Sequence, residues 1–167
     1  MVDACVIIDL DDGGILDKLG GCPSTLSTTD FVNNELTNPL RLQVRRLGIH
    51  IVRHTPSQVE GFSKLLESDR GMSMADASVL VLAQRLGAVL VTGDRPLKNA
   101  AKKNGVTVHG TLWVLDVLVS AGAVSAGKAI EAVRATLKAG SRLPAVECQR
   151  MIRSWAAKSL TEGSATG

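Results

Sequence analysis

A chain of 167 residues is long enough for one domain with a sizeable hydrophobic core. Hydrophobic residues make up 45% of it and charged residues 21%, a balance that excludes an intrinsically disordered protein. The formal net charge of +3 permits a polyanionic partner, but two Phe, two Trp and no Tyr argue against binding of single strands by stacking on aromatic side chains.

The three cysteines are far apart and none belongs to a CxxC motif, so we expect reduced thiols in a cytoplasmic protein. No apolar run approaches the roughly 20 residues that a membrane span needs. The sequence shows no signal peptide either, so we expect no association with a membrane.

The first apolar run, residues 4–10, permits two interpretations, because periodicity does not distinguish helix from strand in so short a segment. In the first, a very short strand ends at Asp3 and a helix follows it. In the second, residues 5–8 form the strand, and Asp9 and Asp11 lie at its tip.

Residues 31–36, FVNNEL, predict a short helix that Thr29 or Asp30 caps. Glu35 is spaced to lie beside the apolar face of this helix. A solvent-exposed glutamate with no special role is the alternative.

The segment after Pro39 is rich in arginine and predicts a helix on which Arg41 and Arg45, four residues apart, share a face. A solvated surface accounts for this pair, and so does contact with the phosphate backbone of RNA. A strand over 49–52 and a helix over 56–66 follow.

Residues 71–110 predict an alternation of helices and strands. Apolar residues recur at helical spacing over 75–86, and the continuous apolar run over 88–91 is typical of a strand covered on both faces. A helix over 95–104 and a strand over 106–108 follow.

Two acidic residues occupy unusual positions in this alternation. Asp94 comes directly after the strand over 88–91, at the edge where parallel α/β sheets bind their ligands. Asp76 lies one turn into the preceding helix, on the side of its apolar residues. We therefore expect a partly buried carboxylate at position 76.

The remaining chain predicts three more helices, over 112–120, 128–139 and 145–158. We expect an α/β fold with three α/β/α layers around a central parallel sheet, followed by C-terminal helices. The expected division is a core over 1–120, packed C-terminal helices over 121–160 and a flexible tail over 161–167. Residues 62–66 and Trp155 are candidates for a partner surface, with core packing as an equal alternative.

The chemistry follows from four acids that this fold brings to one edge, namely Asp3, Glu35, Asp76 and Asp94. Four carboxylates in one site repel each other, and keeping them ionised is costly unless cations neutralise them. Because all the ligands are oxygens, Mg²⁺ or Mn²⁺ is favoured over softer metals. Two such ions about 4 Å apart suit the hydrolysis of a phosphodiester.

The segments that hold these acids resemble the four-acid pattern of PIN-domain ribonucleases, most closely the VapC-like toxin branch and its uncharacterised relatives. They are Asp3 with ACVIIDL, Glu35 in FVNNEL, Asp76 in SMADASVLVLA and Asp94 in VLVTGDRPLKNAAKKNGV. The resemblance runs from Val2 to about Leu118, with a weaker likeness in the helical tail. It implies the same parallel α/β fold with the acids at the carboxyl edge of the sheet.

The resemblance also implies an activity, an endoribonuclease that depends on Mg²⁺ or Mn²⁺. Asp3, Asp76 and Asp94 would be metal ligands, Glu35 would join the metal site or orient the water, and Thr92 would support the site by hydrogen bonding. The toxin branch further implies an antitoxin protein as partner and a homodimer. Four cations just past Asp94 are candidates to guide the RNA, with a solvated helix face as the alternative: Arg95, Lys98, Lys102 and Lys103.

Three departures from the family pattern carry expectations of their own. Cys5 stands where the family usually has Asn, Ser or Thr, so we expect one polar support of the site to be lost. The first strand is very short, which weakens that edge of the site. No second acid follows Asp94 closely, so a second metal should bind weakly or only together with substrate.

Two alternatives remain open. VIIDLDD and the later TGDRPLKNAAKKNGV also resemble motifs of haloacid-dehalogenase-type phosphatases, with Asp9 as nucleophile and Asp11 as acid. Asp12 and Gly13 stand where that pattern has Gly-Thr, and Lys98 stands where it has another acid, so the nuclease is favoured. The second alternative is a non-catalytic PIN-like module that binds RNA or protein.

Overall fold

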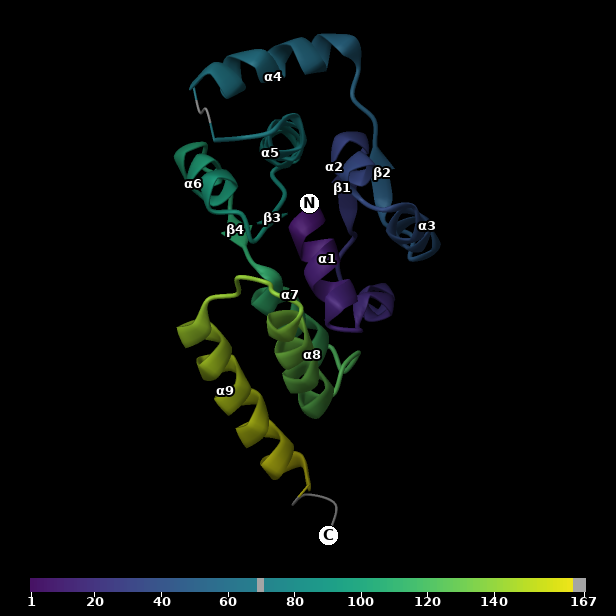
Figure 1. The fold of residues 1–167 in the computed structure, drawn as a ribbon, viewed down its shortest axis with the longest axis vertical. Helices are drawn as coiled ribbons and strands as arrows, with labels where there is room; N and C mark the ends of the chain where they lie inside the picture. The colour runs from purple at the N-terminus through teal and green to yellow at the C-terminus, as the bar shows by residue number, and fades with distance from the viewer. Residues whose placement is uncertain (69–70, 164–167) are drawn as a thin grey trace. The chain divides into compact units, whose positions relative to one another are not determined.

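The computed structural model describes residues 1–68 and 71–163 (Figure 1). Its helices are α1 (Ala4–Asp12), α2 (Asp30–Glu35), α3 (Asn38–Arg46), α4 (Pro56–Ser68), α5 (Met74–Leu86), α6 (Arg95–Lys103), α7 (Thr111–Ser120), α8 (Ala126–Lys138) and α9 (Ala145–Gly163), with a 3₁₀ helix η1 (Leu16–Gly21). Its strands are β1 (Ser27–Thr29), β2 (His50–Val52), β3 (Leu90–Val91) and β4 (Val108–His109).

The chain forms two compact units. The first contains residues 1–8 and 24–110, and the second contains residues 9–23 and 111–167. The chain passes from one unit to the other within α1, after Pro23 and just before α7. Each unit is described by itself below.

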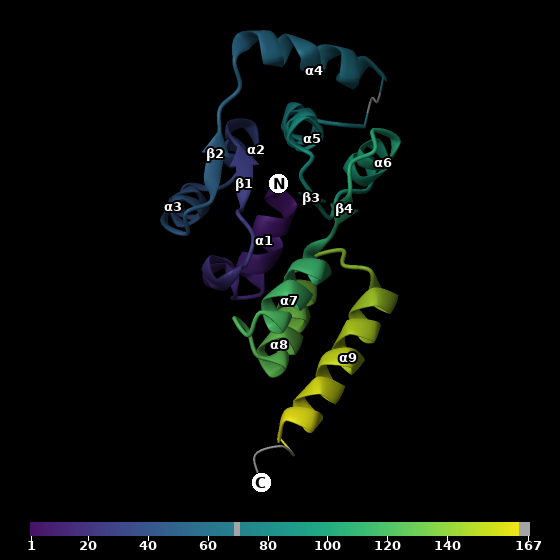
Figure 2. The ribbon, with the colours of Figure 1, turned by 180° about the vertical axis from the view of Figure 1, so that it is seen from behind.

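The first unit is built on parallel strand pairs. β1 pairs with β2, and β3 pairs with β4, both in parallel register. The first residues of the chain lie between the two pairs, as Figure 2 shows. The Val2 amide donates to the carbonyl of Ser27 at 2.8 Å, and Val2 also forms a parallel bridge with Val91. An α/β fold with parallel strands is thus confirmed, and the expected very short first strand serves as the link between the pairs.

The structure distinguishes the two interpretations of the first apolar run. Residues 4–12 form a helix, α1, which begins directly after Asp3. Val6, Ile7 and Leu10 are buried on it at the spacing of one helical face. The alternative strand over residues 5–8 is therefore wrong. The buried residues repeat at about 3.6 residues, the period of a helix, and not at the two residues of a strand.

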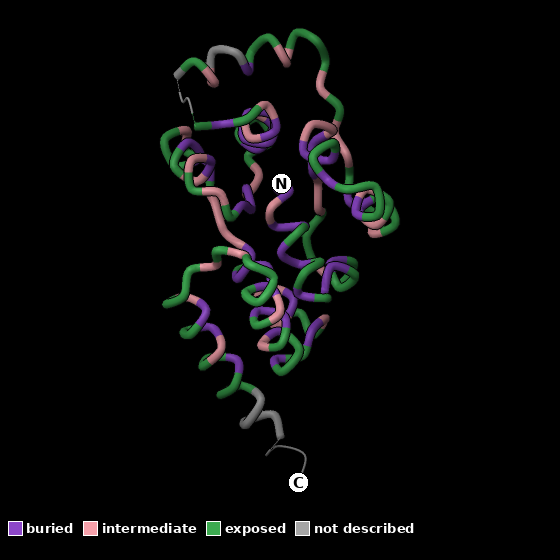
Figure 3. Tube along the Cα trace, viewed as in Figure 1, coloured by how far each residue is buried: buried purple, intermediate pink, exposed green. Residues whose placement is uncertain are grey.

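Helix α5 is the buried helix of the first unit and packs against α2 and α4. Figure 3 shows that much of α5 is buried. Its buried residues are Ala75, Ala77, Ser78, Val79, Leu80, Leu82 and Ala83. The helix begins with a capping box between Ser73 and Asp76 and ends at Gly87, whose φ of 58° suits a residue without a side chain. The predicted helix over 75–86 is thus confirmed together with its end at Gly87, and it begins one residue earlier than predicted, at Met74.

The second unit contains η1, α7, α8 and α9. Trp155 of α9 is fully buried, and its indole Nε1 donates to Oδ1 of Asp116 at 2.9 Å. In the first unit Phe62 is fully buried as well. Core packing, the alternative to a partner surface, therefore accounts for both aromatic residues.

The end of the chain is only partly described. Helix α9 continues to Gly163, and residues 164–167 of the predicted flexible tail lie outside the described residues. In the part of the chain that the structure describes, no helix is both long enough and apolar enough to cross a membrane.

Candidate functional site

Three of the four predicted acids stand at the beginning of a helix. Asp3 directly precedes α1, Asp94 is the N-cap of α6, and Asp76 lies in the first turn of α5. Glu35 is the last residue of α2. Backbone N–H groups at a helix start have no partner within the helix and favour negative charge, so local structure alone supports the first three carboxylates.

Asp3 is the buried member of the set, with 4% of its surface exposed. Its Oδ1 accepts a 2.7 Å hydrogen bond from the amide of Ala4. Its Oδ2 accepts one from the hydroxyl of Thr92 at 2.6 Å and one from the thiol of Cys5 at 3.1 Å. Three donors therefore hold this carboxylate in place inside the protein.

Cys5 links Asp3 to the loop that carries Asp94. Its thiol donates to Asp3, and its sulfur accepts a hydrogen bond from the amide of Gly93 at 3.0 Å. Burial, followed by the negative charge of Asp3, raises the pKa of the Cys5 thiol to about 12, so the group stays a neutral donor. The expected loss of a polar support at this position is wrong, because the thiol makes these hydrogen bonds itself.

Asp94 and Asp76 each use one oxygen to cap their own helix. Oδ1 of Asp94 accepts from the amide of Leu97 at 2.8 Å, and the amide of Asp94 donates to the Thr92 hydroxyl at 3.0 Å. Oδ2 of Asp76 accepts from the amide of Ser73 at 2.7 Å. Thr92 thus contacts two of the predicted acids at once.

Two of the four predicted acids, Glu35 and Asp76, have a raised pKa. Burial first, then the charges of Asp3 and Asp76, raise the pKa of Glu35. Burial also raises the pKa of Asp76, and the charges of Asp3 and Asp94 add to this effect against the opposing hydrogen bonds from Ser73. We call these four side chains, Asp3, Glu35, Asp76 and Asp94, the acidic cluster.

The donor chemistry of the acidic cluster suits a hard divalent cation, because all four groups offer carboxylate oxygens. The helix caps use Oδ1 of Asp94 and Oδ2 of Asp76. The other oxygen of each carboxylate is then left to bind a cation. Within residues 1–68 and 71–163, no three His, Cys, Asp or Glu side chains are grouped closely enough to hold a metal ion.

Two hydroxyl groups connect the helices that carry Glu35 and Asp76, and only the first of them, on Thr29, was singled out from the sequence. Thr29 caps α2 by accepting from the amide of Val32, and its hydroxyl lies 2.7 Å from that of Ser78 on α5. Ser78 donates in turn to the carbonyl of Ala75, so Thr29 is the donor in the contact between the hydroxyls. The cap at Thr29 was foreseeable, but the partner at Ser78 was not, because a serine within a helix has no sequence signature for such a contact.

The predicted RNA-contacting residues occupy different environments. The Arg41 guanidinium donates to the carbonyls of Leu36 and Asn34, so it closes the carboxyl end of α2. Arg45 is exposed in the last turn of α3, where a cation interacts favourably with the helix dipole. Arg95 is exposed at the start of α6, and Lys98 is half-buried on the same helix near Gly110.

The phosphatase alternative requires Asp9 at the tip of a strand. Asp9 instead lies in the second turn of α1 and is buried. Its Oδ2 accepts a 2.5 Å hydrogen bond from the Thr111 hydroxyl, and its backbone carbonyl accepts from Thr136. These contacts give Asp9 a structural role within the second unit.

Comparison with known proteins identifies the family. The family described as a PIN domain matches residues 1–157, which is nearly the whole chain. No curated protein and no solved structure matches the chain. The match covers the strand ends and helix starts that carry Asp3, Glu35, Asp76 and Asp94. The chain therefore belongs to the PIN-domain family.

Proposed function

We propose that this protein is a divalent-metal-dependent endoribonuclease that hydrolyses phosphodiester bonds at the acidic cluster. The observation that carries the proposal is that the buried Thr92 hydroxyl joins Asp3 to the amide of Asp94, while burial and then the charges of the neighbouring acids raise the pKa of Glu35 and Asp76. Ionised carboxylates that lie close together repel one another and destabilise the folded protein, and a bound cation offsets this repulsion. Membership in the PIN-domain family supports the nuclease assignment, because PIN domains are typically nucleases.

In this proposal Asp3, Asp76 and Asp94 hold Mg²⁺ or Mn²⁺. The bound cation supplies Lewis-acid chemistry, which acidifies a water and offsets charge on the scissile phosphate. Thr92 and Cys5 fix the orientation of Asp3 through their hydrogen bonds. Glu35 is exposed at the end of α2, where its carboxylate is accessible to orient a water or to join the metal ligands.

The proposal extends to a biological role, the toxin of a toxin–antitoxin pair in the cytoplasm. The likeness of the motifs around the four acids to the VapC-like branch supports it. An antitoxin protein and a second copy of this chain would then be its partners.

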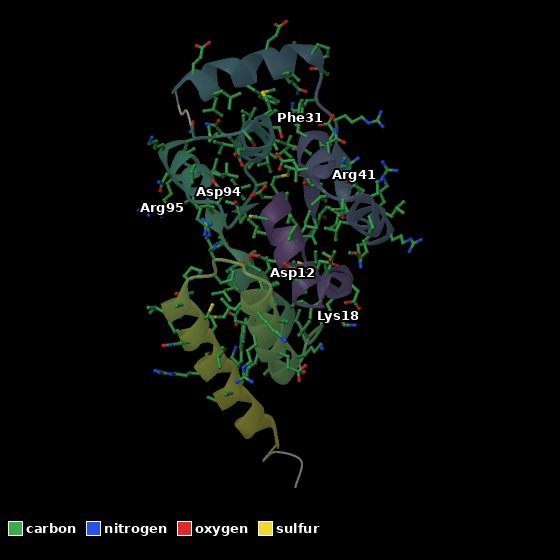
Figure 4. All side chains as sticks on the ribbon, viewed as in Figure 1. Asp12, Lys18, Phe31, Arg41, Asp94 and Arg95 are labelled. Carbon is green, nitrogen blue, oxygen red and sulfur yellow. The ribbon has the colours of Figure 1, made fainter. Side chains whose placement is uncertain are left out.

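The test is a cleavage assay on a fluorescently labelled, unstructured RNA of random sequence, with Mn²⁺ or with EDTA. The informative variant is Asp94→Asn, because asparagine also caps helices well and preserves the α6 cap while removing the charge. Asp12→Asn is the matched control, since Asp12 is an exposed aspartate at the end of α1 (Figure 4).

We expect cleavage by the wild type and by Asp12→Asn with Mn²⁺ only, and a loss of at least about a hundredfold in Asp94→Asn. Equal cleavage by Asp94→Asn and the wild type would refute the assignment. RNA binding without cleavage under all metal conditions would favour a non-catalytic module instead.

A further inference from the structure

An open pocket of about 520 Å³ lies along α6 in the first unit. Its lining residues are Gly71, Arg95, Pro96, Asn99, Lys102 and Lys103. These α6 positions occupy one arc of the helix, separate from the buried face formed by Leu97, Ala100 and Ala101. The volume falls within the range of pockets that take small organic groups, about 300–1,000 Å³.

The described lining residues combine cations with a carboxamide, and none of these residues carries a carboxylate. Arg95, Asn99 and Lys102 are spaced at i, i+4 and i+7, so they form one stripe that extends about 10 Å along the helix. Arg95 and Lys102 are both exposed. None of the ion pairs formed among the described residues involves either cation. The stripe is thus available to an anionic ligand.

Helix electrostatics accounts for only part of this arrangement. Lys102 lies in the last turn of α6, where a cation interacts favourably with the helix dipole. Arg95 is the first residue of the helix, where the same dipole disfavours a cation by a few tenths of a kcal/mol or more. The guanidinium at this position is therefore not explained by the stability of the helix.

The pocket begins one residue after a member of the acidic cluster. Figure 4 shows Asp94 and Arg95 together at the start of α6. Gly71 and Pro96 both line the pocket and lie close together. A Cβ built at Gly71 would lie 3.4 Å from Cβ of Pro96. A ligand in the pocket would thus contact both the cations of α6 and the apolar ring of Pro96.

We propose that the α6 pocket holds the RNA backbone next to the scissile bond, with Arg95 and Lys102 on phosphate oxygens and Asn99 as a further donor. The inference rests on the proposed function, since it makes the pocket a subsite of the same nuclease. A guanidinium forms bidentate hydrogen bonds with phosphate, and a lysine supplies a point charge. Because no aromatic side chain lines the pocket, its binding depends on backbone charge and not on base identity.

The experiment measures binding of a labelled, unstructured single-stranded RNA in EDTA, where metal-dependent cleavage does not occur. Fluorescence anisotropy is recorded over a series of KCl concentrations. The test variant is Arg95→Gln with Lys102→Gln. The matched control is Arg134→Gln with Lys138→Gln, which removes an arginine and a lysine from exposed positions of α8. Thermal unfolding verifies that both double variants are folded.

We expect the pocket variant to bind RNA about tenfold more weakly and the control to bind like the wild type. The salt dependence of log Kd should become shallower by about 1.4 in the pocket variant, since each lost phosphate contact contributes about 0.7 for a single strand. Equal weakening in both double variants, or no weakening in the pocket variant, would overturn the proposal. The proposal would also be overturned if the wild type bound polyglutamate of matched charge as tightly as it binds RNA.

The two proposals fail in different ways. If the pocket variant loses RNA binding while the wild type cleaves nothing with Mn²⁺, the pocket's contact with the RNA backbone stands, but the nuclease assignment and the place of the pocket beside a scissile bond fail. If the wild type cleaves RNA and the pocket variant has an unchanged Kd and an unchanged KM, the pocket assignment fails and the nuclease stands.

Discussion

The hydroxyl of Thr92 donates a 2.6 Å hydrogen bond to Oδ2 of Asp3, across 89 positions of the sequence. The same oxygen of Thr92 accepts a hydrogen bond from the amide of Asp94. Thr92 is fully buried, so water cannot take its place as the hydrogen-bond partner of the Asp3 carboxylate or of the Asp94 amide. One side chain therefore fixes the relative positions of two acids of the cluster.

Replacement of Thr92 tests this connection. Thr92→Val keeps the shape but leaves a buried carboxylate and a backbone amide short of a partner, so we expect a loss of about 1–3 kcal/mol in the free energy of unfolding. Thr92→Ser keeps the hydroxyl and should retain most of that stability. Urea unfolding of the two variants provides the measurement, and equal losses would show that the hydrogen bonds contribute nothing.

The raised pKa of Cys5 predicts slow alkylation. With a pKa of about 12, only about one Cys5 in 10⁴ is a thiolate at pH 8, against roughly a quarter for an ordinary thiol. In metal-free native protein, iodoacetamide should therefore modify Cys5 much more slowly than it does in urea. Mass spectrometry of the peptides gives the rate, and similar rates in the two states would contradict the buried, hydrogen-bonded thiol.

Glu35 should destabilise the metal-free protein at neutral pH. Its pKa is raised in the folded state above the ordinary value of 4.5, so the folded state binds more protons and stability falls as pH rises through the interval above 4.5. Glu35→Gln should then unfold at a higher temperature than the wild type near pH 7, and the advantage should disappear below about pH 4.

Glu60→Gln is the control for this comparison, because Glu60 is exposed on α4. It should leave the unfolding temperature nearly unchanged at either pH. If Glu35→Gln behaves like Glu60→Gln, Glu35 does not belong to the acidic cluster.

Asp9 separates the nuclease from the phosphatase interpretation. Asp9→Asn weakens the buried hydrogen bond from Thr111, so we expect a loss of about 1–3 kcal/mol in stability. RNA cleavage per folded molecule should stay within about twofold of the wild type. Abolished activity in a folded Asp9→Asn protein would instead support a role as nucleophile.

Local patterns in the sequence predicted the helices well. Helical periodicity and Gly87 located α5, and Thr29 was among the two caps expected for α2. These features depend on residues within a few positions of one another. The strands were placed less accurately, since β4 covers Val108–His109 where 106–108 was expected. Strand ends depend on pairing with distant segments.

The environment of Cys5 shows what the sequence did not reveal. A cysteine in place of the usual Asn, Ser or Thr suggested a missing hydrogen bond, yet its sulfur contacts Asp3 and the amide of Gly93, 88 positions away. The capping roles of Asp76 and Asp94 were likewise not anticipated, although both follow from helix starts. The grouping of the acids was predicted only through the parallel α/β arrangement.

Binding of Mn²⁺ tests most directly whether the acidic cluster is a cation site. The measurement is a titration followed by the electron paramagnetic resonance signal of free Mn²⁺, with wild type, Asp94→Asn and Asp12→Asn. We predict that the wild type and Asp12→Asn bind Mn²⁺ and that Asp94→Asn binds it more than about tenfold more weakly, since even a lost outer-shell partner costs about 10- to 100-fold in metal affinity. A wild type that binds no Mn²⁺, or an Asp94→Asn protein that binds it equally well, would contradict the proposal.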